Sequence, residues 1–224
     1  MNSKSIATLR ILLYNLKKST RRKKLILYPK AHFNNVKEIS IEFLEKNNIK
    51  ALILDVDNTL IDYDRNMPDG TVEWVEQLKH NGIKFYIVSN TNKKDKVEQV
   101  SQKLKIKYNY FAKKPLKTGL LKAQKELQEK PENVAVVGDQ IFTDVLGGNR
   151  CKMFTILIEP IAEKDIWLTK VKRPIEIFIK KKYFKKINAE IIRLTDLISE
   201  KEQNRSVFFI TDKRKIKNSI LDKQ

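Results

Sequence analysis

The chain has 224 residues, of which 46 are Lys or Arg and 27 are Asp or Glu, so its formal net charge at pH 7 is +19. This length suits one domain with extensions. The single cysteine, Cys151, excludes an internal disulfide. No apolar run approaches the roughly 18 residues that a membrane-spanning helix needs. We therefore expect a cytoplasmic protein.

The positive charge is concentrated at the two ends of the chain. Residues 1–50 hold 12 basic and 3 acidic side chains, and residues 161–224 hold 17 and 9. Residues 51–160 are close to balance, with 17 basic and 15 acidic side chains. A basic excess outside a balanced centre indicates a polyanionic partner, either an anionic membrane or a nucleic acid.

Four short apolar runs predict the buried strands of a sheet, and they cover residues 49–54, 85–88, 108–111 and 134–137. Between them, apolar residues recur at helical spacing: Val72, Val75 and Leu78, then Val97, Val100 and Leu104, then Leu120, Leu121, Ala123 and Leu127. Alternating strands and helices predict a parallel sheet with right-handed crossovers. The expected fold class is α/β, a Rossmann-like parallel sheet sandwiched by helices.

A polar motif follows each of the four predicted strands. The motifs are Asp55-Val56-Asp57-Asn58-Thr59, Ser89-Asn90, Lys113-Lys114-Pro115, and Gly138-Asp139 with Asp144. In parallel sheets ligands bind at the carboxyl ends of the strands, so these residues can converge on one site. Singly, each motif also fits a solvated turn or a helix cap. Together, the paired carboxylates favour phosphoryl transfer beside a divalent cation.

With these motifs in this order, the chain resembles the haloacid-dehalogenase (HAD) superfamily of aspartate-nucleophile phosphatases over about residues 35–160. The stretch from Val137 to Arg150, with Gly138-Asp139-Gln140 near its start, is similar to the signature of the YqeG-type subfamily, subclass III-A. That subfamily is in turn similar to the phosphatidylglycerophosphate phosphatases, which implies a phosphate-ester substrate and, more narrowly, a phospholipid.

The resemblance implies a role for each motif residue. Asp55 would attack phosphorus and form an aspartyl-phosphate. Asp57 would protonate the leaving alkoxide and then take a proton from water. Ser89 and Asn90 would bind phosphoryl oxygens, and Lys114 would offset the charge of the phosphoryl group and of the nucleophile. Lys113 is the competing choice for that lysine.

The resemblance also implies Mg²⁺ as the cofactor. Asp55, the backbone carbonyl of Asp57, and Asp139 would hold the ion, with waters completing an octahedron. Asp144 would orient Lys114 or a water on the metal.

The spacing of the motifs predicts an open site. The 32 positions from Asp57 to Ser89 and the 25 positions from Ser89 to Lys114 are filled by the expected helices and strands. Neither interval has room for a cap domain, and an open site suits a substrate that is large or presented on a surface. Residues 62–70, here called the flap loop, either contact the substrate or form a plain surface turn.

We expect a HAD-like catalytic domain at 35–160 between basic extensions at 1–34 and 161–224. In the first extension, Ile6, Leu9, Leu12 and Leu16 can share a helical face ahead of a lysine-rich run. In the second, the apolar residues at 175–179 precede the lysines at 180–182. Apolar residues among lysines are typical of interfacial segments, although they could also cover the sheet edge.

The sequence thus predicts a capless, Mg²⁺-dependent phosphomonoesterase, peripheral on the inner face of the membrane, that acts on phosphatidylglycerophosphate. Two alternatives stay open. An open site and a basic surface also suit a phosphatase that acts on nucleic-acid ends or on a phosphoprotein. A degenerate site would leave a non-catalytic binding module.

Overall fold

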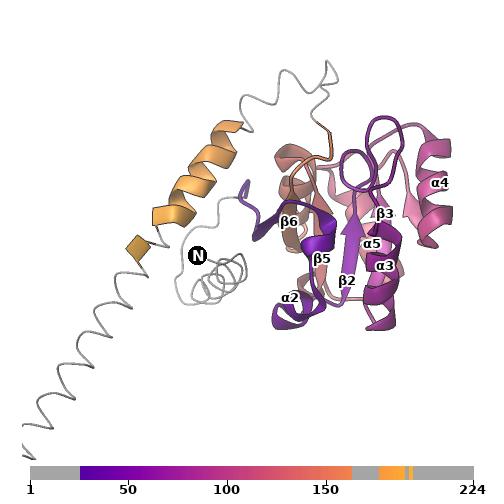
Figure 1. Cartoon of the computed structure of the whole chain (residues 1–224), viewed down its shortest axis with the longest axis horizontal. Coiled ribbons are helices and arrows are strands. Elements are labelled where there is room, and N and C mark those ends of the chain that lie inside the picture. Colours follow the sequence, from indigo (N-terminus) through magenta and orange to yellow (C-terminus); the bar gives the residue numbers. More distant parts are fainter. Residues whose placement is uncertain (1–25, 163–176, 190–191, 194–224) are drawn as a thin grey trace, which may run out of the picture. The chain divides into compact units, whose positions relative to one another are not determined.

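The computed structural model describes residues 26–162, 177–189 and 192–193. Residues 26–162 form an α/β domain, and residues 177–189 form a helix of their own (Figure 1). The chain divides into two compact units, with the division between Ile179 and Lys180. The helical face predicted within residues 1–34 lies outside the described residues.

The sheet has six parallel strands in the order β1-β6-β5-β2-β3-β4. The strands are β1 (Ala31–Phe33), β2 (Ala51–Leu54), β3 (Lys84–Val88), β4 (Tyr108–Asn109), β5 (Val134–Gly138) and β6 (Phe154–Ile158). The parallel α/β fold predicted from the sequence is confirmed. Strands β1 and β6 were not predicted, and β1 lies within the residues assigned to the N-terminal extension.

The helices are α2 (Ile41–Lys46), α3 (Thr71–His80), α4 (Lys94–Leu104), α5 (Lys117–Leu127) and α6 (Leu146–Arg150). Three single turns complete the domain: the 3₁₀ turns η2 (Val36–Glu38) and η3 (Pro131–Asn133), and the π-helical turn η4 (Ile141–Val145). Turn η4 runs directly into α6 and follows β5, which places an irregular turn at the carboxyl end of the sheet.

Hydrophobic cores lie on both faces of the sheet because successive side chains of a strand point to opposite faces. Leu52 and Leu54 of β2 belong to a core with residues of α2, α3 and α4. Ala51 and Ile53 of the same strand belong to a core with residues of α5. All four β2 residues are buried, as expected for a central parallel strand covered by helices on both sides.

Two local predictions were wrong. Leu121 was grouped with Leu120, Ala123 and Leu127 as apolar residues at helical spacing, but it is 36% exposed. One residue turns an α-helix by about 100°, so Leu121 points away from buried Leu120. The strand predicted at 108–111 ends at Asn109, because Phe111 has a φ of 50° and donates its N–H to the carbonyl of Thr91.

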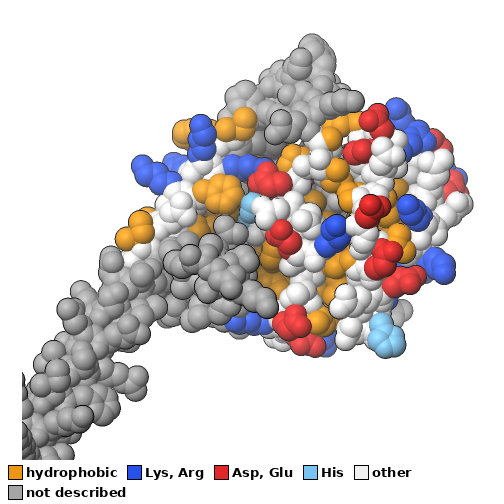
Figure 2. All heavy atoms as spheres, viewed as in Figure 1, with side chains coloured by type: hydrophobic (Ala, Val, Ile, Leu, Met, Phe, Trp, Pro, Cys, Tyr) orange, Lys and Arg blue, Asp and Glu red, His pale blue; other side chains and the backbone are white. Residues whose placement is uncertain are grey.

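The domain has no cap among residues 26–162. Helix α3 is the only helix between β2 and β3, and α4 is the only helix between β3 and β4. Among the described residues, no helix is both long and apolar enough to cross a membrane. Acidic, basic and hydrophobic side chains are intermixed over the face of the domain in Figure 2, in keeping with its near-balanced charge.

Candidate active site

The predicted site residues gather at the carboxyl edge of the sheet. Asp55 follows β2, Ser89 follows β3, Lys114 follows the short β4, and Asp139 follows β5. The chain passes from β2 to β3 on one side and returns to β5 on the other, so the strand order reverses at β2. This switch point is where open α/β sheets form their binding crevice.

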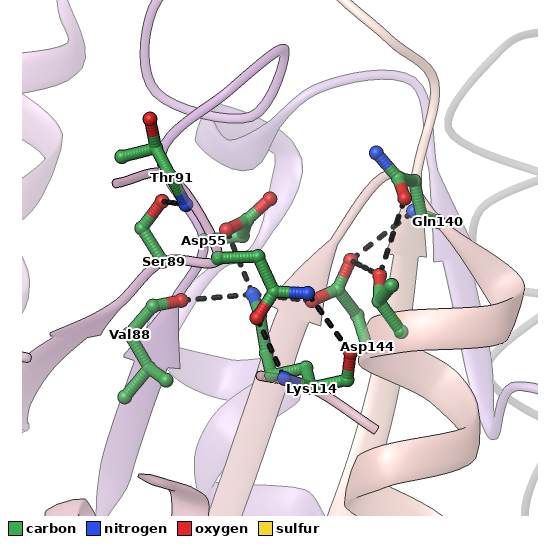
Figure 3. A network of polar contacts seen from close by, with 9 residues as sticks. Asp55, Val88, Ser89, Thr91, Lys114, Gln140 and Asp144 are labelled. Atoms are coloured by element: carbon green, nitrogen blue, oxygen red, sulfur yellow. Dashed lines mark hydrogen bonds and ion pairs between the residues drawn. The ribbon is translucent and has the colours of Figure 1, made fainter. Parts of the chain in front are cut away.

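Three buried side chains form what we call the inner cluster: Asp55, Lys114 and Asp144 (Figure 3). The Lys114 ammonium donates to Oδ1 of Asp55 at 2.7 Å and to Oδ1 of Asp144 at 2.6 Å. Its third donor reaches the carbonyl of Val88 at 2.8 Å. An ammonium has three donors, so every one of them is used within the site.

Burial sets the protonation of this cluster. It raises the pKa of Asp55 to about 7, with Lys114 opposing and Asp144 adding to the rise. Burial also disfavours the charged form of Lys114, but the carboxylates of Asp144 and Asp55 outweigh it and raise the lysine pKa. Lys114 therefore stays an ammonium. A divalent cation beside Asp55 would lower that carboxyl's pKa and keep Asp55 ionised.

Gly138 and the π-helical turn η4 position Asp144. Oδ2 of Asp144 accepts hydrogen bonds from the N–H of Gln140 at 3.2 Å and from the Thr143 hydroxyl at 3.1 Å. A Cβ at Gly138 would lie 2.3 Å from the Asp144 carboxyl carbon, closer than any side chain tolerates. Glycine at 138 therefore makes room for the buried carboxylate, and π-helical turns often occur at functional sites.

The residues after β3 help to hold Lys114 in place. Buried Ser89 accepts a hydrogen bond from the N–H of Thr91 at 3.2 Å, which leaves the serine hydroxyl proton to donate. The Asn90 side chain accepts from the N–H of Lys114 at 2.6 Å and donates to the Lys114 carbonyl at 2.9 Å. The observed contacts of the Asn90 side chain thus position Lys114. Lys113 is exposed and its ammonium lies 4.9 Å from the ring centre of Phe111.

A divalent cation fits between the carboxylates of Asp55, Asp139 and Asp144. One oxygen from each lies within 4.8 Å of the others. Carboxylate oxygens are the hard ligands that Mg²⁺ and similar cations prefer. Lys114 already neutralises part of the charge of Asp144, whereas Asp55 and Asp139 follow adjacent strands of the sheet.

A second lysine lies beside Asp57, and we call this pair the outer pair. The ammonium of Lys96, on α4, forms a short ion pair with Oδ1 of Asp57. The Lys96 side chain is 10% exposed, and that of Asp57 is 35% exposed. Lys96 was not among the site residues predicted from the sequence. Its spacing was a usable signal, since Lys96 stands four residues before buried Val100 in the first turn of α4, next to the carboxyl edge.

The flap loop is an ordered turn that is tied to the rest of the site. The N–H of Asn66 donates to Oδ1 of Asp62 at 2.8 Å, which closes the turn. Arg65 forms an ion pair with Asp95 of α4 at 2.8 Å. Asn58, which has a φ of 58°, donates from its side chain to the hydroxyl of Tyr63 at 2.9 Å. The loop therefore holds a fixed position beside Asp57.

The chain is similar to known phosphatases. The family described as "Mitochondrial PGP phosphatase" matches residues 12–162. "Probable phosphatase YqeG" of Bacillus subtilis (strain 168) is 41% identical over 154 residues, which cover 68% of this chain and 89% of that protein.

Solved structures resemble the chain more distantly. An uncharacterized protein from Listeria monocytogenes serotype 4b is 19% identical with a TM-score of 0.42, and the match covers 53% of this chain and 85% of that one. A provisionally named HAD superfamily (subfamily III A) hydrolase from Legionella pneumophila is 25% identical with a TM-score of 0.37, and covers 44% and 59%.

Proposed function

Since the chain belongs to the mitochondrial PGP phosphatase family and is a HAD phosphatase of the YqeG type, we propose that it removes the terminal phosphate of phosphatidylglycerophosphate. In this proposal an oxygen of Asp55 attacks phosphorus, and the bond from phosphorus to the glycerol oxygen breaks. The products of this first step are an aspartyl-phosphate and the free hydroxyl of phosphatidylglycerol.

The inner cluster is the observation that carries the proposal. Lys114 fixes the Asp55 carboxylate at 2.7 Å and places a full positive charge where the phosphoryl group would collect negative charge. Asp57 is more exposed and stands two residues along the chain. It would give its proton to the leaving oxygen, then take one from the water that hydrolyses the aspartyl-phosphate and regenerates Asp55.

Mg²⁺ is the proposed cofactor. Asp55, Asp139 and the carbonyl of Asp57 would hold it, and Asp144 would support the site through Lys114. When bound, the ion would neutralise phosphoryl oxygens and orient the phosphate for attack. Ser89, whose hydroxyl proton is available, would donate to a phosphoryl oxygen, and Asn90 would keep Lys114 in register.

Exposed apolar residues support action at a membrane surface. Residues 110–116, which we call the rim loop, leave the sheet at the same edge as the site. Tyr110, Phe111 and Leu116 are 39%, 53% and 50% exposed, and Lys113 lies among them. Loops that mix aromatic residues and lysines suit the interface of an anionic bilayer. The basic extensions at 1–34 and 161–224 would add electrostatic attraction.

The experiment measures phosphate release from phosphatidylglycerophosphate in mixed micelles with Mg²⁺, for the wild type and Asp55→Asn. Release by the wild type alone supports both the lipid substrate and the nucleophile. If the wild type ignores the lipid but hydrolyses an aryl phosphate in an Asp55-dependent way, the phosphatase stands and the lipid is wrong. Nucleic-acid ends and phosphoproteins would then be the substrates to test.

A further inference from the structure

A small recess lies between the flap loop and α4, on the side of the site where Asp57 stands. Its volume is about 70 Å³. Ile61, Met67 and Val100 form its apolar surface, and Arg65, Lys96 and Lys103 supply the charge. The lining, as far as the described chain forms it, holds three cations and no carboxylate, although Arg65 pairs with Asp95 and Lys96 with Asp57, neither of which lines the recess. A recess of this size and charge suits a small anionic group.

We propose that this basic recess binds a second anionic group, one carried by the leaving alcohol of the substrate. The site would then select phosphomonoesters whose leaving group has a negative charge of its own. The inference rests on the proposed function and extends it, because the glycerol that leaves phosphatidylglycerophosphate carries a phosphodiester at its far end.

The position of the recess follows from the role of Asp57. A general acid must lie within hydrogen-bond reach of the leaving oxygen. Lys96 is bonded to the Asp57 carboxylate, so its ammonium lies roughly 5–6 Å from that oxygen, the length of two hydrogen bonds in series. In a three-carbon alcohol the two terminal oxygens are separated by roughly 5 Å. The second anion would therefore reach Lys96.

The burial of Lys96 makes an anionic partner necessary. A lysine is rarely buried without a charged partner, and here the partner is the carboxylate that must also contact the substrate. When Asp57 turns toward the leaving oxygen, Lys96 requires another anion, and the substrate would supply it. The bond from Lys96 to Oδ1 would then be released at the moment that Asp57 needs that oxygen for the substrate.

The walls of the recess are held before any substrate arrives. Arg65 of the flap loop donates to Asp95 at 2.8 Å and to Gln99 at 3.2 Å, and both acceptors lie on α4. These bonds join the loop to the helix. A preorganised cationic recess gains affinity because little ordering is needed on binding.

The test uses two soluble phosphomonoesters with the same three-carbon leaving group. One leaving group ends in a methyl phosphodiester, and the other ends in an uncharged methyl ether. We expect the wild type to favour the charged ester in kcat/KM by about 10- to 100-fold, the range of one charge-assisted hydrogen bond. Lys96→Met should remove most of this preference, mainly through KM for the charged ester, and Lys96→Arg should restore part of it.

Lys94→Ala is the matched control, since Lys94 is an exposed lysine of the same helix and should leave the preference unchanged. Thermal unfolding of each variant shows whether it is folded. If Lys96→Met does not fold, the preference of Lys96→Arg tests the proposal in its place. The proposal that the recess binds an anion would be refuted by either of two results. One is an equal loss of kcat/KM for both esters in Lys96→Met, and the other is a wild type that does not prefer the charged ester. If the wild type prefers the charged soluble ester but does not hydrolyse the lipid, the proposed anion binding in the recess stands. Phosphatidylglycerophosphate is then refuted as the substrate.

Discussion

The lysine–aspartate ion pairs of the site fall into two groups, the inner cluster and the outer pair, and the two groups differ in burial. In the inner cluster the side chains of Lys114, Asp55 and Asp144 are 2%, 8% and 1% exposed. In the outer pair Lys96 is 10% exposed and Asp57 is 35% exposed. A fully buried charge cannot exchange its partner for water at low cost, whereas a charge at the surface can. The inner cluster thus suits a catalytic role in which its charges keep their partners. The outer pair suits a role in which a charge exchanges its partner for the substrate.

The largest expected effect comes from the nucleophile. Asp55→Asn should lower turnover by more than about 10⁴-fold, as when the nucleophile of another hydrolase is removed. The fold should persist, because Lys114 keeps Asp144 as its partner and one buried negative charge is lost. Phosphate release and thermal unfolding measured together check this. Near-normal turnover in Asp55→Asn would disprove the covalent mechanism.

Removing the lysine of the inner cluster should affect stability as well as activity. Lys114→Met leaves Asp55 and Asp144 buried without their cation, which should lower the free energy of unfolding by about 3–5 kcal/mol. Chemical denaturation measures this change.

Asp57→Asn is the contrasting variant from the outer pair. It should lower turnover by about 10²- to 10⁴-fold and lower the free energy of unfolding by about 1–3 kcal/mol, less than Lys114→Met, because the amide oxygen can still accept a hydrogen bond from buried Lys96. If both variants proved equally destabilising, the distinction between the two pairs would fail.

The sequence predicted the sheet and the motif positions because both depend on local patterns. Apolar runs located β2, β3 and β5, and each motif directly follows a strand, so chain order alone placed Asp55, Ser89 and Asp139 at one edge. Strand β6 was not predicted, because the predicted strands were those followed by a polar motif and the apolar run of β6 has none after it. Strand β1 has only three residues, and its pairing with β6 bridges more than a hundred positions of the chain.

The partners of Lys96 and Asn90 depend on tertiary contacts, although the spacing from Lys96 to Val100 could have placed this lysine on the buried face of its helix. Lys96 belongs to a helix that carries several lysines, and only the packing of α4 on the sheet directs this one toward Asp57. The turn after β4 brings the Lys114 backbone within hydrogen-bond distance of the Asn90 amide, a contact that the sequence did not predict, and the contact of Asn90 with phosphate stays a prediction. A choice between two adjacent lysines, 113 and 114, likewise requires knowledge of which side chain is buried.

Metal binding distinguishes the four aspartates of the site from one another. Mg²⁺ at 100 times its Kd should stabilise the folded wild type by about 2.7 kcal/mol, and a chelator should reverse this. Asp139→Asn should lose most of that stabilisation, measured as the Mg²⁺-dependent shift of the unfolding temperature. Asp57→Asn should retain it, because Asp57 would contribute only its backbone carbonyl. A shift that survives in Asp139→Asn but disappears in Asp144→Asn would assign the ligand to Asp144 instead.

The smallest effect concerns the rim loop, which extends the comparison from the site to the surface around it. Full burial of a Phe side chain contributes about 1.5–3 kcal/mol, so Phe111→Ser should weaken binding to vesicles rich in phosphatidylglycerol by about tenfold or more. Binding to neutral phosphatidylcholine vesicles should be weak throughout, since the neighbouring lysines need anionic lipid.

Ile26→Ser is the matched control: Ile26 is 46% exposed, and its carbonyl bonds to Asn149 near the end of α6, at the amino edge of the sheet. Hydrolysis of a soluble aryl phosphate should be the same in both variants, because neither residue contacts the inner cluster or the outer pair. Equal vesicle binding by Phe111→Ser and Ile26→Ser would show that the membrane contact lies elsewhere in the chain, and the basic extensions would be the segments to delete next.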